Sequence, residues 1–202
     1  MGLISNGTTI FDNGSMASGV GGSLNFISKA TASASASIEF TSGIDSTYKE
    51  YIFYFVNMHP STGGSEFLVN FSTDNGSNYN VTKTTTSFRN FHQESGGGGN
   101  ISYDAGRDLA QSTSDFELAH DVTDDNDGSI SGFLHLFNPS STTFVKHFIG
   151  RTNTHQEDEA NRANVENFKA GYCNTTLAVD ALIFKMSSGN IDAGEILLFG
   201  VN

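Results

Sequence analysis

The sequence contains no tryptophan, one cysteine and two prolines among its 202 residues. A single cysteine, Cys173, excludes an intrachain disulfide framework, so stability must come from burial and from assembly. A catalytic cysteine needs a base beside it in space, which no pattern in the sequence indicates. The default expectation for Cys173 is therefore a small buried hydrophobe.

Positive charge is also scarce. Ten lysines and arginines face 22 aspartates and glutamates, which gives a net charge of −12 and a pI near 4.6. This balance argues against a surface that neutralises phosphates and against docking on anionic lipid. No apolar run approaches the length of a membrane span. We therefore expect no nucleic-acid partner and no membrane insertion.

The motifs of common enzyme classes are missing. There is no Gly-x-Ser-x-Gly elbow and no His-Glu-x-x-His pair, and the glycine run 96–99 lacks the Gly-Lys-Ser/Thr ending of a phosphate loop. Glu157, Asp158 and Glu159 are adjacent acids in a polar stretch, which more often form a solvated face than a glycosidase pair. The sequence predicts no catalytic residue, no cofactor and no enzymatic activity.

Two groups of residues raise the question of a metal. Asp124, Asp125 and Asp127 form a weak calcium candidate, because calcium prefers several carboxylate oxygens. The EF-hand pattern fails there, and Asp-Asn-Asp-Gly also favours a hairpin loop. His135 and His147 are predicted on consecutive strands, but zinc needs further ligands. A loop and isolated histidines are the favoured interpretations, so we expect no metal site.

Glycine and phenylalanine are abundant, at 22 and 17 residues, and short apolar runs recur from residue 24 onward. The run 50–58 is apolar on both parities, which predicts a strand covered on both faces. About ten strands joined by short turns predict an all-β, jelly-roll-like two-sheet antiparallel sandwich over residues 24–202. Because free chain ends fray, the apolar run that ends at the terminus is expected to be held within a sheet.

Three segments carry more specific expectations. Asn75-Gly76 predicts a type I′ hairpin that joins a strand over 66–72 to a strand over 79–91. The polar stretch 152–163 predicts a long exposed loop with a helical turn at 156–160. Aromatic residues flank the glycine run, and they are expected either as buried strand residues or as exposed stacking groups; they are Phe88, Phe91, Tyr103 and Phe116.

Residues 1–23 are rich in glycine, serine, threonine and asparagine. This composition predicts either a disordered leader or an extended N-terminal arm that becomes ordered against a partner. If it is an arm, its attachment residues are expected to be the apolar and β-branched ones, namely Ile4, Thr9, Ile10 and Phe11.

Four segments resemble small β-sandwich virion proteins of tailed phages, especially marine phages. They are residues 4–14, 32–48, 71–79 and 186–200. Proteins of this kind are labelled tail fibre or structural protein. The resemblance implies a jelly-roll-like fold, assembly in the host cytoplasm, a place in the virion and a homo-oligomer, most often a trimer. It brings no catalytic residues.

The first functional hypothesis is a tail-fibre or tail-tip module that binds other virion proteins and a glycan or protein on the host surface. The alternatives are a capsid decoration protein and a carbohydrate-binding or depolymerase domain. Loops on a rigid sandwich commonly carry binding. The loops 93–114, 123–128 and 152–165 are therefore expected to face a receptor through Gly97, Gly98, Asn100, Tyr103, Asn126, His155 and Glu157.

Overall fold

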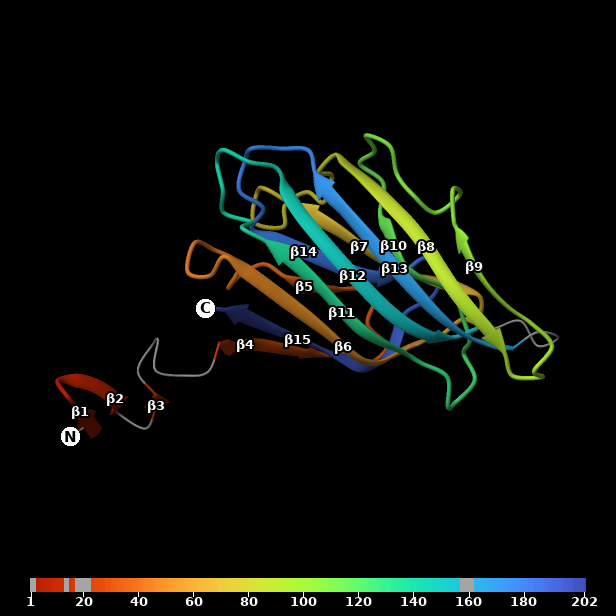
Figure 1. The fold of residues 1–202 in the computed structure, drawn as a ribbon, viewed down its shortest axis with the longest axis horizontal. Helices are drawn as coiled ribbons and strands as arrows, with labels where there is room; N and C mark the ends of the chain where they lie inside the picture. Colours follow the sequence, from red (N-terminus) through yellow and green to blue (C-terminus); the bar gives the residue numbers. More distant parts are fainter. Residues whose placement is uncertain (1–2, 13–14, 17–22, 157–161) are drawn as a thin grey trace.

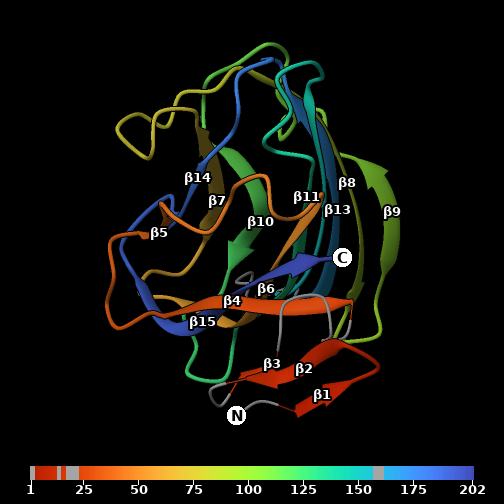
Figure 2. The same cartoon turned by 90° about the vertical axis from the view of Figure 1, so that its left-hand side faces the viewer.

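The computed structural model describes residues 3–12, 15–16, 23–156 and 162–202. Two antiparallel sheets pack face to face, with the small sheet covering one side of the large one (Figure 1; Figure 2). This confirms the expected all-β two-sheet sandwich, although the sheets are unequal, with eight strands against four. No helix in the described part of the chain is long and apolar enough to cross a membrane.

In spatial order, the large sheet contains β4 (Leu24–Thr31), β15 (Ile191–Val201), β6 (Glu50–Pro60), β11 (Ile130–Phe137), β12 (Lys146–His155), β13 (Ala163–Cys173), β8 (Lys83–Gln93) and β9 (Gly99–Tyr103). The small sheet contains β10 (Phe116–Val122), β7 (Ser65–Ser72), β14 (Ala181–Met186) and β5 (Ile38–Phe40).

The core lies between the sheets and is dominated by aromatic rings. Phe55 of β6 makes edge contacts with Phe67 and with Phe184, at ring-centroid distances of 5.1 and 5.4 Å. These rings are fully buried, as are Leu134 and Leu198. Alternation along a strand places every second side chain in this layer. Truncating one such phenylalanine to alanine typically lowers the free energy of unfolding by about 3–5 kcal/mol.

The last strand is held as the sequence predicts. β15 pairs with β4 on one side and with β6 on the other, and the pairing reaches Val201 opposite both Leu24 and Glu50. Ladder bonds on both edges satisfy its backbone groups almost to the chain end. The strand is therefore an integral, interior strand of the large sheet.

The predicted hairpin at Asn75-Gly76 is wrong in its pairing, although the turn forms. Both residues have the positive φ angles that a type I′ turn requires, 57° and 82°. However, β7 pairs with β10 and β14 in the small sheet, whereas β8 pairs with β13 and β9 in the large one. The turn therefore carries the chain from one sheet to the other.

The predicted loop over 152–163 is also too long. β12 continues to His155 and β13 begins at Ala163, with His155 opposite Asn164 in the ladder. The residues of this stretch alternate between the two faces, so Thr152 and Thr154 are buried while Asn153 lies on the solvent side. The expected helical turn at 156–160 lies almost wholly outside the described residues.

The N-terminal segment contains a small sheet of its own. It consists of β1 (Leu3–Ser5), β2 (Thr8–Asp12) and β3 (Ser15–Met16). Asn6 and Gly7, with φ angles of 49° and 78°, make the tight turn between β1 and β2. Of the expected arm residues, Ile4 lies exposed in β1, and Thr9, Ile10 and Phe11 lie in β2. Within the described residues, none of these strands pairs with a strand of the sandwich.

Candidate functional site

The three loops proposed from the sequence contribute residues to one end of the sandwich. Glu94 and Asp127 lie in two different loops and His155 lies at the end of β12, and all three line one polar hollow of about 350 Å³. The other lining residues are Ser129, Asn153 and Asn164. Convergence of separate loops on one concavity is the usual construction of a binding site on a β-sandwich.

A second, more open hollow of about 530 Å³ adjoins the first, because Asn164 lines both. Its remaining lining residues are Asn90, Phe91, His92, Gly99, Asn100 and Ile101. We call the two hollows together the loop-end site. Its lining combines side-chain amides, carboxylates and imidazoles with a few apolar groups.

Strand register explains why these residues meet. Asn153 and Asn164 lie on neighbouring strands of the large sheet, and Asn90 lies on the next strand along. Glu166 is opposite both Asn153 and Asn90. All four side chains occupy positions that alternate with the buried ones, so they emerge on the outer face of the sheet.

Hydrogen bonds hold the polar groups of the site in defined orientations. The Asn153 amide donates to Oδ1 of Asn164 at 2.7 Å, and Nδ2 of Asn90 donates to Oε2 of Glu166 at 3.0 Å. His155 Nε2 lies 3.3 Å from Oε1 of Glu94. Each amide has further donor or acceptor capacity beyond these bonds. The site can therefore offer both donors and acceptors to a ligand.

The structure places the predicted receptor-facing residues in different positions. Asn100 and His155 line the loop-end site. Gly97, Gly98 and the exposed Asn126 belong to loops beside it without lining either hollow, and Tyr103 lies further along β9. Glu157 lies outside the described residues.

The sequence-based list missed the asparagines that form the base of the site. Asn90, Asn153 and Asn164 lie within strands, and the stretch containing the last two was interpreted as a loop. A period-two alternation was present in the chain, since Thr152, Thr154 and Val165 are buried while Asn153 and Asn164 are not. That alternation is the pattern that could have revealed them.

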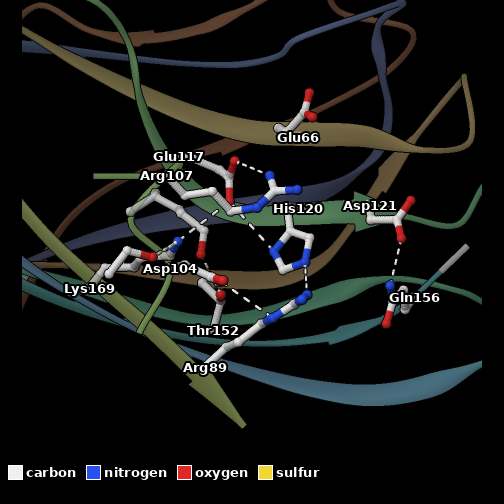
Figure 3. A network of polar contacts seen from close by, with 12 residues as sticks. Glu66, Arg89, Asp104, Arg107, Glu117, His120, Asp121, Thr152, Gln156 and Lys169 are labelled. Carbon is white, nitrogen blue, oxygen red and sulfur yellow. Dashed lines mark hydrogen bonds and ion pairs between the residues drawn. The ribbon is translucent and has the colours of Figure 1, made fainter. Parts of the chain in front are cut away.

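A buried ionic network lies behind the site, between the two sheets (Figure 3). Arg107 forms an ion pair with Glu117 at 2.5 Å, and Nζ of Lys169 lies 3.4 Å from the same carboxylate. Arg89 of β8 contacts the ring of His120 and lies 3.3 Å from Asp104. The network thus ties β8, β10, β13 and the chain after β9 together.

Burial determines the protonation of this network. Desolvation, and after it the nearby cations Arg107, Arg89 and Lys169, together lower the pKa of His120 to about 3. Burial also lowers the pKa of Lys169, which the Glu117 carboxylate partly offsets. His120 is only 1% exposed. The network therefore acts as internal support, and a substrate has no direct access to its imidazole.

A side-chain bond connects this support to the loops. Gln156 donates from Nε2 to Oδ2 of Asp121 at 2.6 Å (Figure 3). The backbone N–H of Thr123 donates to the carbonyl of His155. The start of the 152–165 segment is thereby fixed to the end of β10. This fixes His155 at the rim of the loop-end site.

The three aspartates considered for calcium lie in three different environments. Asp125 forms an ion pair with Arg162 at 2.6 Å, and Asp127 lines the loop-end site. Asp124 is exposed. Among the residues that the structure describes, no group of three or more histidine, cysteine or acidic side chains is arranged to hold a metal ion.

The other sequence candidates also have definite environments. His135 contacts Glu50, whereas His147 lies beside Tyr172 with ring centroids 6.0 Å apart. Cys173 is fully buried, and desolvation raises the pKa of its thiol to about 12.

The four aromatic residues near the glycine run divide between the two expectations. Phe116 is fully buried in β10. Phe88 and Tyr103 face each other on β8 and β9 and are 42% and 55% exposed, so the buried interpretation is wrong for these two. Phe91 is half-buried and lines the loop-end site.

Comparison of the chain with protein-family models, with curated proteins and with solved structures finds no match.

Proposed function

We propose that this chain is a structural module of a tailed-phage particle, in the tail fibre or tail tip, and that it attaches to the host surface through the loop-end site. The observation that carries the proposal is the convergence of two loops and the ends of β12 and β13 on one polar concavity. The sequence resemblance to phage virion proteins supplies the biological setting.

The two ends of the sandwich suit a module that is anchored at one end and binds at the other. Residues 1–23 lead into β4 at Leu24, which the ladder aligns with Val201 and Glu50. Asn153 and Asn90 lie toward the other end of the sheet, near the last residues of β12 and β8. An arm held by another virion protein would therefore leave the loop-end site pointing away from the attachment point.

The chemistry of the site favours a ligand rich in hydroxyl groups. Amides and carboxylates at fixed positions can pair with neighbouring hydroxyls as donors and acceptors, while Phe91 and Ile101 offer apolar contact. Glu94 and Asp127 make the first hollow acidic, which disfavours strongly anionic ligands. A neutral or amino-sugar polysaccharide of the host surface fits these properties.

The proposal includes no catalytic step. Glu94, which lies 3.3 Å from His155 at the site, is 60% exposed at its side chain, so it is not shielded from water. The buried acid–base groups, Glu117 and His120, lie behind the sheet. Binding without turnover is the activity we infer.

A capsid decoration protein is the second candidate, and one observation favours it. The outer face of the large sheet carries exposed Phe88 and Ile149, which suits packing on a flat protein lattice. Immunogold labelling of purified particles, with quantitative mass spectrometry of copy number, separates the two. We expect label at the tail and about a dozen copies; hundreds of copies over the capsid would overturn the tail assignment.

Removal of residues 1–23 tests the anchoring role independently. We expect the shortened chain to fold but to be absent from particles. Its incorporation at the normal level would contradict an anchoring arm.

A further inference from the structure

We propose that the outer face of the large sheet is an interface at which a second copy of this chain packs. The surface consists of Tyr54, Phe88, Phe133, Ile149, Phe168 and Ala170, and we call it the aromatic face. It is distinct from the loop-end site, so the proposal does not depend on what that site binds.

The aromatic face is continuous across the sheet. Tyr54 lies opposite Phe133, and Phe168 lies opposite Phe88, with Arg151 between Phe133 and Phe168 in the same row. The rings of Phe88 and Phe168 stack in parallel, with centroids 4.6 Å apart. Ile149 and Phe88 are 51% and 42% exposed. The other four residues of the face are half-buried, so the face joins two exposed side chains to four partly exposed ones. A continuous apolar surface of this kind often marks an interaction site.

The aromatic face is uneven as well as apolar. Two hollows of about 410 and 270 Å³ adjoin each other, sharing Thr86, Ile149 and Ala170. They form where small residues, such as Ala170 and Gly171, lie beside aromatic side chains. Ridges and hollows on one surface allow two identical surfaces to interdigitate.

Charge indicates which partner fits. The chain carries a net charge of −12, so two copies repel each other over most orientations. On this face the charged groups are already paired, Arg151 with Glu166 and His135 with Glu50. Arg151 also lies over the Phe168 ring, 5.0 Å from its centroid. A cationic partner would be drawn to the acidic surface elsewhere, whereas a second copy can approach through this face, where Glu166 is paired with Arg151 and Glu50 is in contact with His135.

The available area is sufficient. Five neighbouring strands, each about 4.8 Å wide and with about seven residues at about 3.3 Å per residue, cover roughly 550 Å² in projection. A stable interface buries about 800 Å² of accessible surface per partner, and side-chain relief raises accessible area above projected area. A face of this size can support a dimer or the contacts of a closed ring.

Sedimentation equilibrium of the full chain tests the proposal, with Ile149→Asp as the disrupting variant. Ile149 lines both hollows, and an unpaired carboxylate buried there should raise the dissociation constant at least about tenfold. The matched control is Leu177→Asp, because Leu177 is equally apolar, 63% exposed and outside this face. Circular dichroism verifies that both variants fold.

We expect a self-associating wild-type chain, a dissociated Ile149→Asp variant and an associated Leu177→Asp variant. A wild-type chain that stays monomeric, or equal association of the two variants, would overturn the proposal. Asn164→Ala should leave association unchanged, so loss of ligand binding at the loop-end site and loss of self-association can be told apart.

Discussion

Asn153 and Asn164 are joined side chain to side chain across β12 and β13, with Nδ2 of Asn153 2.7 Å from Oδ1 of Asn164. The same Asn153 amide lies 3.3 Å from the carbonyl oxygen of Val165. This contact orients Asn164 at the point where the two hollows of the loop-end site meet. The two strands thereby supply a rigid base beneath loops that belong to other parts of the chain.

The ionic network behind the site is expected to contribute strongly to stability. Glu117→Gln removes the carboxylate shared by Arg107 and Lys169 and leaves buried positive charge unpaired. Breaking a buried pair on one side typically costs about 3–5 kcal/mol of unfolding free energy. Urea unfolding followed by circular dichroism measures the change, which suits a chain without tryptophan.

Glu195→Gln is the matched control for this prediction. Glu195 pairs with Lys29 at 2.6 Å, but both side chains are well exposed. Exposed pairs contribute little to stability because water screens them, so we expect a much smaller loss than in Glu117→Gln. Similar losses of unfolding free energy in the two variants would show that the network stabilises the fold no more than an exposed ion pair does.

Stability is expected to fall as the solution is acidified below about pH 6.5, through His120. Its pKa is lowered to about 3 in the folded chain, against 6.5 in a model compound, because burial disfavours the charged ring. Protons therefore bind the unfolded state more readily over this window, so the stabilising contribution is complete above pH 6.5 and is lost toward pH 3. The slope approaches about 1.4 kcal/mol per pH unit.

His120→Gln should flatten the pH dependence between pH 6.5 and 5, where most carboxylates stay ionised. Unfolding free energies of both proteins across this window provide the measurement. The other five histidines are common to both proteins and cancel in the comparison. Identical slopes would show that His120 does not remain neutral in the folded chain.

Cys173 is expected to resist thiol reagents in the native protein. It is fully buried, and a pKa raised to about 12 from 9.0 lowers the thiolate fraction about a thousandfold. Labelling with a chromogenic disulfide should be slow in buffer and immediate in urea. Rapid labelling of the folded chain would mean that the thiol is accessible.

The sequence predicts the sandwich well because the strand pattern is local. The apolar run that ends at Val201 indicated a strand held within a sheet, and β15 is paired with β4 and β6. The partner of a strand is a non-local property, however. Asn75-Gly76 fixes the backbone angles of a turn, but the residues beyond it join different sheets because each completes a different ladder.

The candidate site was predictable in outline rather than in its residues. Loop composition indicated which segments would meet, and Asn100 and His155 lie where those segments converge. The asparagines of β12 and β13 were missed because polar residues in a strand resemble a loop unless their alternation is followed. The buried network was missed for a related reason, since a lysine such as Lys169 is expected at the surface until its partners are known.

The central claim, that the loop-end site binds a polysaccharide of the host surface, is tested most directly by equilibrium binding of the full chain to host surface polysaccharide. Wild type is compared with Asn164→Ala and with Asn174→Ala. Asn164 lies near one end of β13, and Asn174 is an exposed, hydrogen-bonded asparagine just beyond the other end. We predict saturable binding that Asn164→Ala weakens about tenfold, since lost polar contacts to a ligand cost about 1–1.5 kcal/mol, and that Asn174→Ala leaves unchanged. No binding by the wild-type chain, or equal binding by all three, would contradict the claim.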